Sequence, residues 1–198
     1  MINIEGAKTK AGIENDEDMN IKSNEIESLF SCNIFFIGFM GVGKTTVSSY
    51  LSNLLNMEEI DIDNYIEEKE SMTVAEMFKK YGEVYFRKCE TKTLIELQEK
   101  SNRIISCGGG IVLKDENIDL MRKQGKVVLL TASPQTIYER VRYSNDRPIL
   151  NNNMNVEFIS SLMEKRKDRY LEATDLIINT DDKTIEEVCR EIIKKLNK

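Results

Sequence analysis

A glycine-rich run directly follows an apolar stretch near the start of the chain. Gly38-Phe39-Met40-Gly41-Val42-Gly43-Lys44-Thr45 reads G-x-x-x-x-G-K-[ST] and comes after Ile34-Phe35-Phe36-Ile37. Between a strand and a helix, such a loop turns its backbone N–H groups inward and binds phosphate at the helix N-terminus. Lys44 would add a cation near the terminal phosphates, and Thr45 a hydroxyl for Mg²⁺. The motif predicts nucleotide binding; a glycine-rich turn without a ligand is the alternative.

Two acidic residues, Asp61 and Asp63, stand at the end of the next short apolar stretch. In a parallel sheet, ligands gather at the carboxyl ends of the strands. A spacing of two residues puts both side chains on the same side of an extended chain. One carboxylate could then orient the water shell of Mg²⁺ while the other reaches an acceptor hydroxyl. A helix N-cap is the alternative for either acid, and particularly for Asp63.

Three consecutive glycines, Gly108, Gly109 and Gly110, follow the apolar pair Ile104-Ile105. Three glycines in a row cost conformational entropy, and their usual purpose is a close approach of the backbone to a ligand or a positive φ angle. A second substrate could therefore lie against them. A plain tight turn is the alternative.

Four arginines complete the set of candidates: Arg87, Arg140, Arg147 and Arg166. Taken singly, an arginine on a helix is more often a solvated surface cation than a ligand. Arg147 is the exception, because it precedes a proline, which holds it extended in a loop, and because guanidinium binds phosphate or carboxylate with paired donors. The chain has no histidine, so a general base must be a carboxylate, lysine, tyrosine or thiolate.

These residues must be positioned by strands that alternate with helices, the pattern of a parallel sheet covered by helices. The predicted strands are Asn33–Ile37, Glu59–Asp61, Arg103–Ser106, Lys126–Thr131 and Asp175–Asn179. The predicted helices are Thr45–Leu55, Asp63–Lys69, Thr73–Tyr81, Glu83–Lys100, one that Ser133-Pro134 opens and that runs to about Tyr143, and one around Arg166. Between the last two, Ser144–Asn153 breaks the periodicity and predicts a lid loop.

Composition limits the class of protein. A chain of 198 residues suits one domain, and no apolar stretch approaches the length of a membrane span. The net charge of −6 without a basic stripe argues against a nucleic-acid partner. Four cysteines without a C-x-x-C pair favour reduced thiols in the cytoplasm. Residues 1–30, with seven acids against three lysines, predict a flexible acidic extension before a domain over residues 31–198.

Together these motifs resemble the shikimate kinase family, phosphate-loop small-molecule kinases with a nucleoside monophosphate kinase-like fold. The resemblance spans about Asn33 to the C-terminus. It is carried by Gly38–Thr45 with Thr46, Asp61-Ile62-Asp63, Phe86-Arg87 after Gly82-Glu83, Gly108-Gly109-Gly110, Arg147-Pro148-Ile149-Leu150 and Glu164-Lys165-Arg166. It implies a three-layer α/β fold in which helices flank a five-stranded parallel sheet, with a lid loop. The implied activity transfers the γ-phosphate of ATP to the 3-hydroxyl of shikimate, giving 3-phosphoshikimate and ADP in aromatic amino acid biosynthesis.

The resemblance also implies a role for each candidate residue. Lys44, Asp63 and Arg147 would be catalytic, and Thr45 and Asp61 would serve Mg²⁺. ATP would be bound by Gly41, Val42, Gly43, Lys44, Thr45, Thr46, Arg140, which would stack on adenine, and Arg147 on the lid. Shikimate would be bound by Asp63, Arg87, Arg166, Gly108, Gly109, Gly110 and the apolar wall of Phe78 and Phe86. Near the adenine, the family has an aspartate-threonine pair where this chain has Asn179-Thr180.

Two other functions remain open from the sequence. A related kinase, such as a gluconate kinase, would keep the ATP apparatus and change the acceptor. A non-catalytic nucleotide-binding module would keep only the fold. The paired arginines and the triple glycine favour shikimate over gluconate, and the intact set of catalytic residues argues against the binding module. We therefore expect a cytoplasmic, monomeric enzyme that binds ATP, shikimate and Mg²⁺, without a nucleic-acid or membrane partner.

Overall fold

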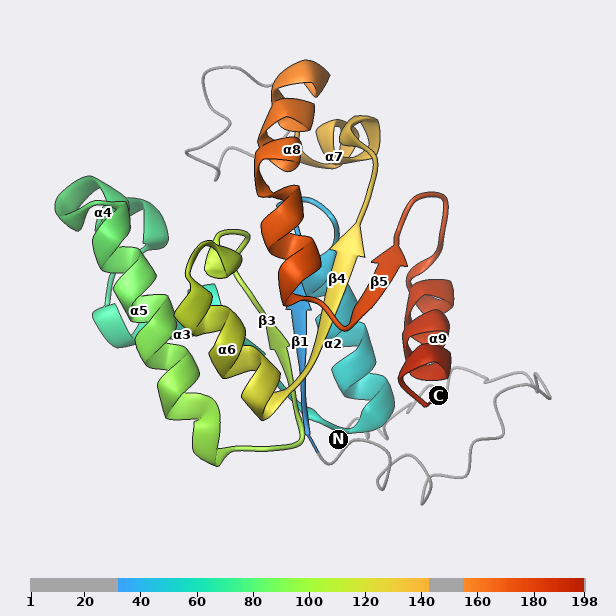
Figure 1. The fold of residues 1–198 in the computed structure, drawn as a ribbon, viewed down its shortest axis with the longest axis horizontal. Coiled ribbons are helices and arrows are strands. Elements are labelled where there is room, and N and C mark those ends of the chain that lie inside the picture. Colours follow the sequence, from blue (N-terminus) through green and yellow to red (C-terminus); the bar gives the residue numbers. More distant parts are fainter. Residues whose placement is uncertain (1–31, 143–154, 198) are drawn as a thin grey trace, which may run out of the picture.

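The computed structural model describes residues 32–142 and 155–197. Five strands form one parallel sheet in the order β2-β3-β1-β4-β5, shown in Figure 1. The strands are β1 (Asn33–Ile37), β2 (Glu58–Asp61), β3 (Arg103–Ser106), β4 (Gly125–Thr131) and β5 (Leu176–Asn179). The predicted α/β class with a five-stranded parallel sheet is therefore confirmed.

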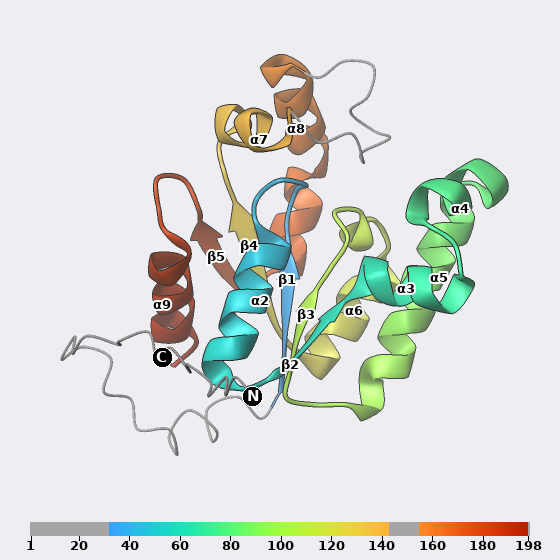
Figure 2. The ribbon, with the colours of Figure 1, turned by 180° about the vertical axis from the view of Figure 1, so that it is seen from behind.

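Helices cover both faces of the sheet. They are α2 (Lys44–Leu55), α3 (Ile62–Glu70), α4 (Val74–Tyr81), α5 (Glu83–Glu96), α6 (Asp115–Gln124), α7 (Pro134–Val141), α8 (Val156–Ala173) and α9 (Ile185–Leu196), with short 3-10 turns η2 (Leu97–Glu99) and η3 (Ile111–Leu113). Figure 1 looks onto the face covered by α6 and α8, and Figure 2 onto the face covered by α2 and α9.

Two apolar cores result from the alternation of side chains along the buried strands. On β1, Ile34 and Phe36 pack with residues of α2 and α9, whereas Phe35 and Ile37 pack with residues of α5 and α6. All four side chains are 0% exposed. The central strand is thereby anchored on both faces, and the loop that follows it leaves the sheet at a fixed position.

The structure corrects two predicted elements. The helix predicted over Glu83–Lys100 ends at Glu96, and the turn η2 follows it. The chain after Asp61 is not extended as expected, because α3 begins at Ile62. The flexible extension predicted for residues 1–30 and the lid predicted over 144–153 lie outside the described residues, and so does Arg147. No helix among the described residues is long and apolar enough to cross a membrane.

Candidate active site

The glycine-rich loop between β1 and α2 has the geometry of a phosphate cradle. Gly38, Gly41 and Gly43 have φ angles of 140°, 79° and 98°, a region that side chains other than glycine rarely adopt. Gly43 occupies the N-cap position of α2 but, having no side chain, forms no capping hydrogen bond to the first N–H groups of the helix. Because the first N–H groups of a helix have no partner within the helix, they point into the loop and favour an anion there.

Lys44, the first residue of α2, is folded back onto this loop. Its Nζ donates to the carbonyl oxygens of Gly38 at 2.9 Å and Phe39 at 3.0 Å. The ammonium group is therefore held beside the cradle, within reach of whatever anion the loop binds.

Asp61, at the end of β2, has two partners. Its Oδ1 accepts from the backbone N–H groups of Asp63 at 3.1 Å and Asn64 at 3.2 Å, and so caps α3. Its Oδ2 accepts from the Thr45 hydroxyl at 3.3 Å. The sequence favoured Asp63 over Asp61 as the possible N-cap of this helix, but the structure shows that Asp61 is the N-cap of α3. Asp61 and Thr45 together present the hard oxygen ligands that Mg²⁺ prefers, so this pair fits a magnesium site beside the phosphate loop.

Asp63 projects from the first turn of α3 toward the triple glycine. Its Oδ1 is buried and has no hydrogen-bond partner among the described residues. A Cβ on Gly108 would lie only 2.6 Å from this oxygen. Burial, with a smaller contribution from Asp61, raises the pKa of Asp63 to about 6 although Lys44 and Arg87 lower it. A buried, unpaired acceptor in a cleft is a candidate functional group.

Glu90 on α5 is a second buried carboxylate that the sequence reasoning missed. Its side chain is 0% exposed and pairs with Arg87 Nη1 at 2.8 Å. Its Oε1 has no partner among the described residues and lies 3.1 Å from a Cβ built on Gly108. Burial raises the pKa of Glu90 to about 7 against the influence of Arg87. The signal was available: Phe86, Glu90 and Leu94 recur every four residues, which places Glu90 on an apolar helix face.

Arg87 lies between acidic and aromatic partners. Glu83 accepts from its Nε at 3.1 Å and its Nη2 at 2.9 Å, in addition to the contact with Glu90. The guanidinium carbon lies 5.9 Å from the ring centroid of Phe78 and 5.5 Å from that of Phe86. A Cβ on Gly110 would collide with this guanidinium. The absence of a side chain at Gly110 therefore makes room for Arg87.

Arg166 reaches the same turn from α8. Its Nη1 donates to the carbonyl oxygen of Gly109 at 3.3 Å, and its guanidinium lies 6.0 Å from the ring centroid of Phe39. Tyr170, one helical turn later, donates its hydroxyl to the same carbonyl at 2.5 Å. Each of the three glycines thus meets functional side chains: Gly108 faces Asp63 and Glu90, Gly109 binds Arg166 and Tyr170, and Gly110 accommodates Arg87.

Arg140 on α7 binds the backbone of the site. Its Nη1 donates to the carbonyl oxygens of Gly41 at 3.4 Å and Val42 at 3.3 Å, and its guanidinium also donates to the hydroxyl and carbonyl of Thr180, both at 3.1 Å. The Thr180 hydroxyl is within 3.2 Å of the Val42 carbonyl. Beside it, Asn179 donates to Asp181 at 3.1 Å. Thr180 and Arg140 thereby connect the phosphate loop to the segment after β5.

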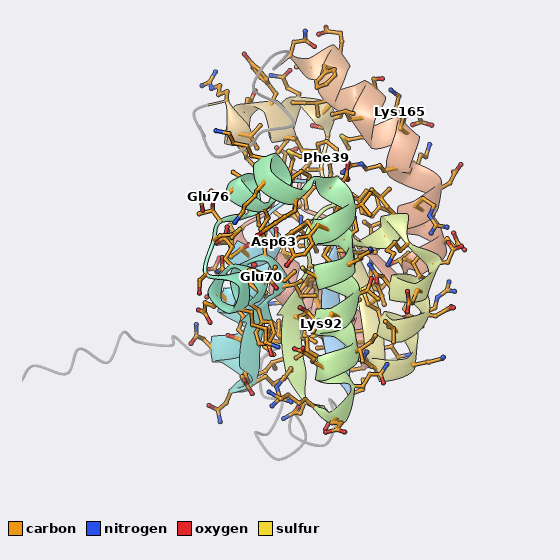
Figure 3. All side chains as sticks on the ribbon, turned by 90° about the vertical axis from the view of Figure 1, so that its left-hand side faces the viewer. Phe39, Asp63, Glu70, Glu76, Lys92 and Lys165 are labelled. Atoms are coloured by element: carbon orange, nitrogen blue, oxygen red, sulfur yellow. The ribbon has the colours of Figure 1, made fainter. Side chains whose placement is uncertain are left out.

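One cleft of about 370 Å³ joins most of these groups. It is lined by Met40, Gly41, Gly43, Lys44, Thr45, Thr46, Asp61, Asp63, Ser106, Cys107, Gly108, Gly109 and Arg140. Val42, within the loop, is buried. Arg87 and Arg166 do not line the cleft but lie beside Gly110 and Gly109, and the Arg87 guanidinium lies over the rings of Phe78 and Phe86. Figure 3 labels Phe39 toward the top of the molecule and Asp63 below it, near mid-height.

Comparisons with known proteins agree with this geometry. The family model described as shikimate kinase matches residues 40–197. The chain is 42% identical over 162 residues to a shikimate kinase of Caldanaerobacter subterraneus, covering 82% of this chain and 94% of the relative. It is 40% identical to that of Sulfurihydrogenibium, covering 84% and 98%. A solved Acinetobacter baumannii shikimate kinase in complex with shikimate superposes with a TM-score of 0.81 at 31% identity, covering 88% of this chain and 96% of that one.

Proposed function

Because this chain belongs to the shikimate kinase family, it transfers the γ-phosphate of ATP to the 3-hydroxyl of shikimate, and we propose which of its residues carry that reaction. The observation that supports the assignment best is the single cleft that runs from the phosphate loop to the buried carboxylate of Asp63. It allows an anionic chain and a hydroxyl acceptor to lie end to end.

The phosphates of ATP would occupy the N–H groups of the loop and of the first turn of α2. Lys44 would leave the carbonyls of Gly38 and Phe39 and follow the negative charge onto the transferring phosphate. Little covalent chemistry is needed in phosphoryl transfer, so alignment and charge neutralisation supply most of the rate. Arg140 would border the adenine, and Arg147, which the structure does not describe, would contact the phosphates from the lid.

Mg²⁺ would be held by the Thr45 hydroxyl with Asp61 oriented toward it, since the two side chains already lie 3.3 Å apart. When bound, the ion neutralises charge on the phosphate oxygens. Asp61 can serve this purpose without losing its capping role, because a different oxygen atom caps α3.

The acceptor would be oriented by groups of opposite charge at its two ends. Asp63 would accept hydrogen bonds from the ring hydroxyls through its unpaired Oδ1, and Arg87 and Arg166 would bind the carboxylate with paired donors. The Gly108–Gly110 backbone and the rings of Phe78 and Phe86 would form the wall. Asp63 would act mainly by positioning the hydroxyl, because a carboxylate is a weak base toward an alcohol.

We further propose that the protein is a cytoplasmic monomer. Its four free cysteines fit a reducing compartment. Sedimentation of the purified protein would measure the oligomeric state.

A coupled ADP-release assay with shikimate, with gluconate and without acceptor tests the acceptor directly. Shikimate should accelerate ADP release strongly, and gluconate should leave the rate at the level without acceptor. Acceleration by gluconate alone would favour the related sugar-acid kinase. No acceleration by either acceptor, in a folded protein that binds ATP, would favour the non-catalytic module.

A further inference from the structure

Tyr170 shares one backbone acceptor with Arg166. The Tyr170 side chain is 5% exposed, and its hydroxyl donates to the Gly109 carbonyl at 2.5 Å. Arg166 donates to the same oxygen at 3.3 Å. Burial raises the pKa of Tyr170 to about 12, so the phenol keeps its proton at neutral pH and remains a donor. Of the two hydrogen bonds to the Gly109 carbonyl, the one from Tyr170 is the shorter.

The shared acceptor creates a competition when substrate arrives. Arg166 uses one of its five N–H groups on Gly109, and a shift of the guanidinium toward the substrate carboxylate would lengthen or break this contact, which is already the longer of the two. Gly109 is half-buried, so a carbonyl that lost its donor there would be poorly compensated by solvent. With Tyr170 in place, the Gly109 oxygen keeps a donor after Arg166 has moved. The cost of releasing the arginine is then small.

We propose that Tyr170 is a positioning residue for the acceptor: its hydroxyl holds the Gly109 carbonyl and thereby leaves Arg166 free to bind the substrate carboxylate. This inference rests on the proposed role of Arg166. It assigns to α8 two coupled functions separated by one helical turn, a mobile donor at Arg166 and a fixed donor at Tyr170.

The surroundings of Tyr170 allow its hydroxyl to be removed without collapse of the ring. Its ring lines an apolar cavity of about 360 Å³ together with Phe39, Leu129, Met163 and Leu171. Phenylalanine keeps all of these apolar contacts and removes only the hydrogen bond. Tyr170→Phe is therefore the variant that isolates the proposed interaction.

The first test compares the steady-state constants of Tyr170→Phe with those of the unmodified enzyme. KM for shikimate should rise about fivefold to tenfold, the equivalent of one lost hydrogen bond, because Arg166 becomes the only donor to Gly109 and is retained there. KM for ATP and kcat should stay within about twofold, since the effect falls on binding and not on the chemical step. An unchanged KM for shikimate would overturn the inference.

Tyr85→Phe is the matched control. Its hydroxyl also forms a 2.5 Å hydrogen bond, to Glu70, and neither residue lines the cleft. Loss of this bond should leave KM for shikimate unchanged. If Tyr85→Phe raised KM for shikimate as much as Tyr170→Phe, a nonspecific loss of packing in the domain would explain both results, and the inference would fail.

A double-mutant cycle with Arg166→Ala separates this inference from the proposed function. Arg166→Ala should itself weaken shikimate binding, and in that background Tyr170→Phe should have no further effect on kcat/KM for shikimate. If the two losses multiplied, Tyr170 would not act through Arg166, and the inference alone would be refuted. If Arg166→Ala left KM for shikimate unchanged, the proposed role of Arg166 would be refuted and the inference with it.

Discussion

The Asp63 side chain destabilises the folded state but is suited to binding a hydroxyl of the substrate. Its buried oxygen, which has no partner among the described residues, destabilises the folded state, and burial raises the pKa of this carboxyl. In the proposed function, a ring hydroxyl of the substrate would supply the missing donor. The acceptor would then stay unsatisfied until substrate binds, as is common where stability is traded for activity.

Asp63→Asn should stabilise the protein at neutral pH. Because the folded-state pKa of about 6 lies above the ordinary value of 3.8, folding favours the protonated acid; this stability is full below pH 4 and is lost as the pH rises through about 6. The variant cannot ionise, so its free energy of unfolding should exceed that of the unmodified protein by about 3 kcal/mol at pH 7.5. Urea unfolding at several pH values measures the difference.

The advantage of Asp63→Asn should shrink toward zero at pH 4, where the unmodified acid is protonated as well. An advantage independent of pH would mean that the amide simply packs better. Turnover should fall at every pH, since the amide no longer offers two carboxylate oxygens.

Lys44→Met should lower kcat about a hundredfold or more. The loss corresponds to about 3 kcal/mol of charge stabilisation on the transferring phosphate. Lys123→Met, which removes an exposed cation on α6, is the control and should leave kcat unchanged. Unchanged turnover of Lys44→Met, with the fold retained by circular dichroism, would exclude the proposed role.

At the residue scale, the sequence identified groups that a motif marks and missed groups that only packing reveals. Lys44, Thr45, Asp61 and Asp63 were identified, and the structure brings all four to one cleft. Glu90 and Tyr170 were missed, because a single glutamate or tyrosine on a helix is unremarkable until the neighbouring helix and turn are in place. Arg140 was assigned to adenine from the resemblance, and its contacts to the loop carbonyls could not be inferred from spacing.

Among the elements, the turn after β3 determines how the acceptor side is arranged. Its glycines are not required by backbone strain alone: Gly110 has a φ of −106°, which any residue can adopt. Glycine is needed at position 110 for steric reasons, because the Arg87 guanidinium fills the space that a Cβ would occupy. The triple glycine was predicted to lie against substrate, which stays a prediction; the structure shows that Gly108 and Gly110 make room for Asp63, Glu90 and Arg87.

Gly110→Ala should weaken shikimate binding at least tenfold while the protein remains folded. The new methyl group collides with the Arg87 guanidinium and displaces it, whereas the backbone conformation suits alanine. KM for shikimate and KM for ATP, measured side by side, test this expectation, and the constant for ATP should hardly change. An equal rise in both would indicate that the turn had rearranged and that Arg87 was not specifically displaced.

The strands were easier to predict than the helices. All five strands were predicted. The apolar runs of β1, β3 and β4 are largely buried, so few polar positions obscure them, whereas the edge strands β2 and β5 keep exposed positions. Helices α6 and α9 were not predicted. Helix α5 was predicted to run to Lys100 with Leu97 facing inward. Leu97 is 0% exposed, but the chain tightens into η2 from this residue.

For the whole molecule, the extension is the segment that the family does not account for. The family model begins at residue 40, and the relatives cover 82–84% of this chain but 94–98% of their own length. Deletion of residues 1–30 should therefore leave kcat and both KM values within about twofold and the midpoint of thermal unfolding unchanged. A marked loss of solubility or turnover would show that the extension contributes to the domain.

With the proposed roles, the strand order would separate the two substrates across the sheet. Asp63 and the triple glycine after β2 and β3, with Arg166 from α8, would form the acceptor side, and the nucleotide side would border β4 and β5, where Arg140, Thr180 and Lys183 lie beside Val42 and Gly43 of the loop. Only β1 and its loop belong to both. Exchanging residues 62–113 together with α8, which carries Arg166, should thus change the alcohol that the enzyme accepts while the phosphate loop and Asp61 stay as they are, and these are natural boundaries for building chimaeras.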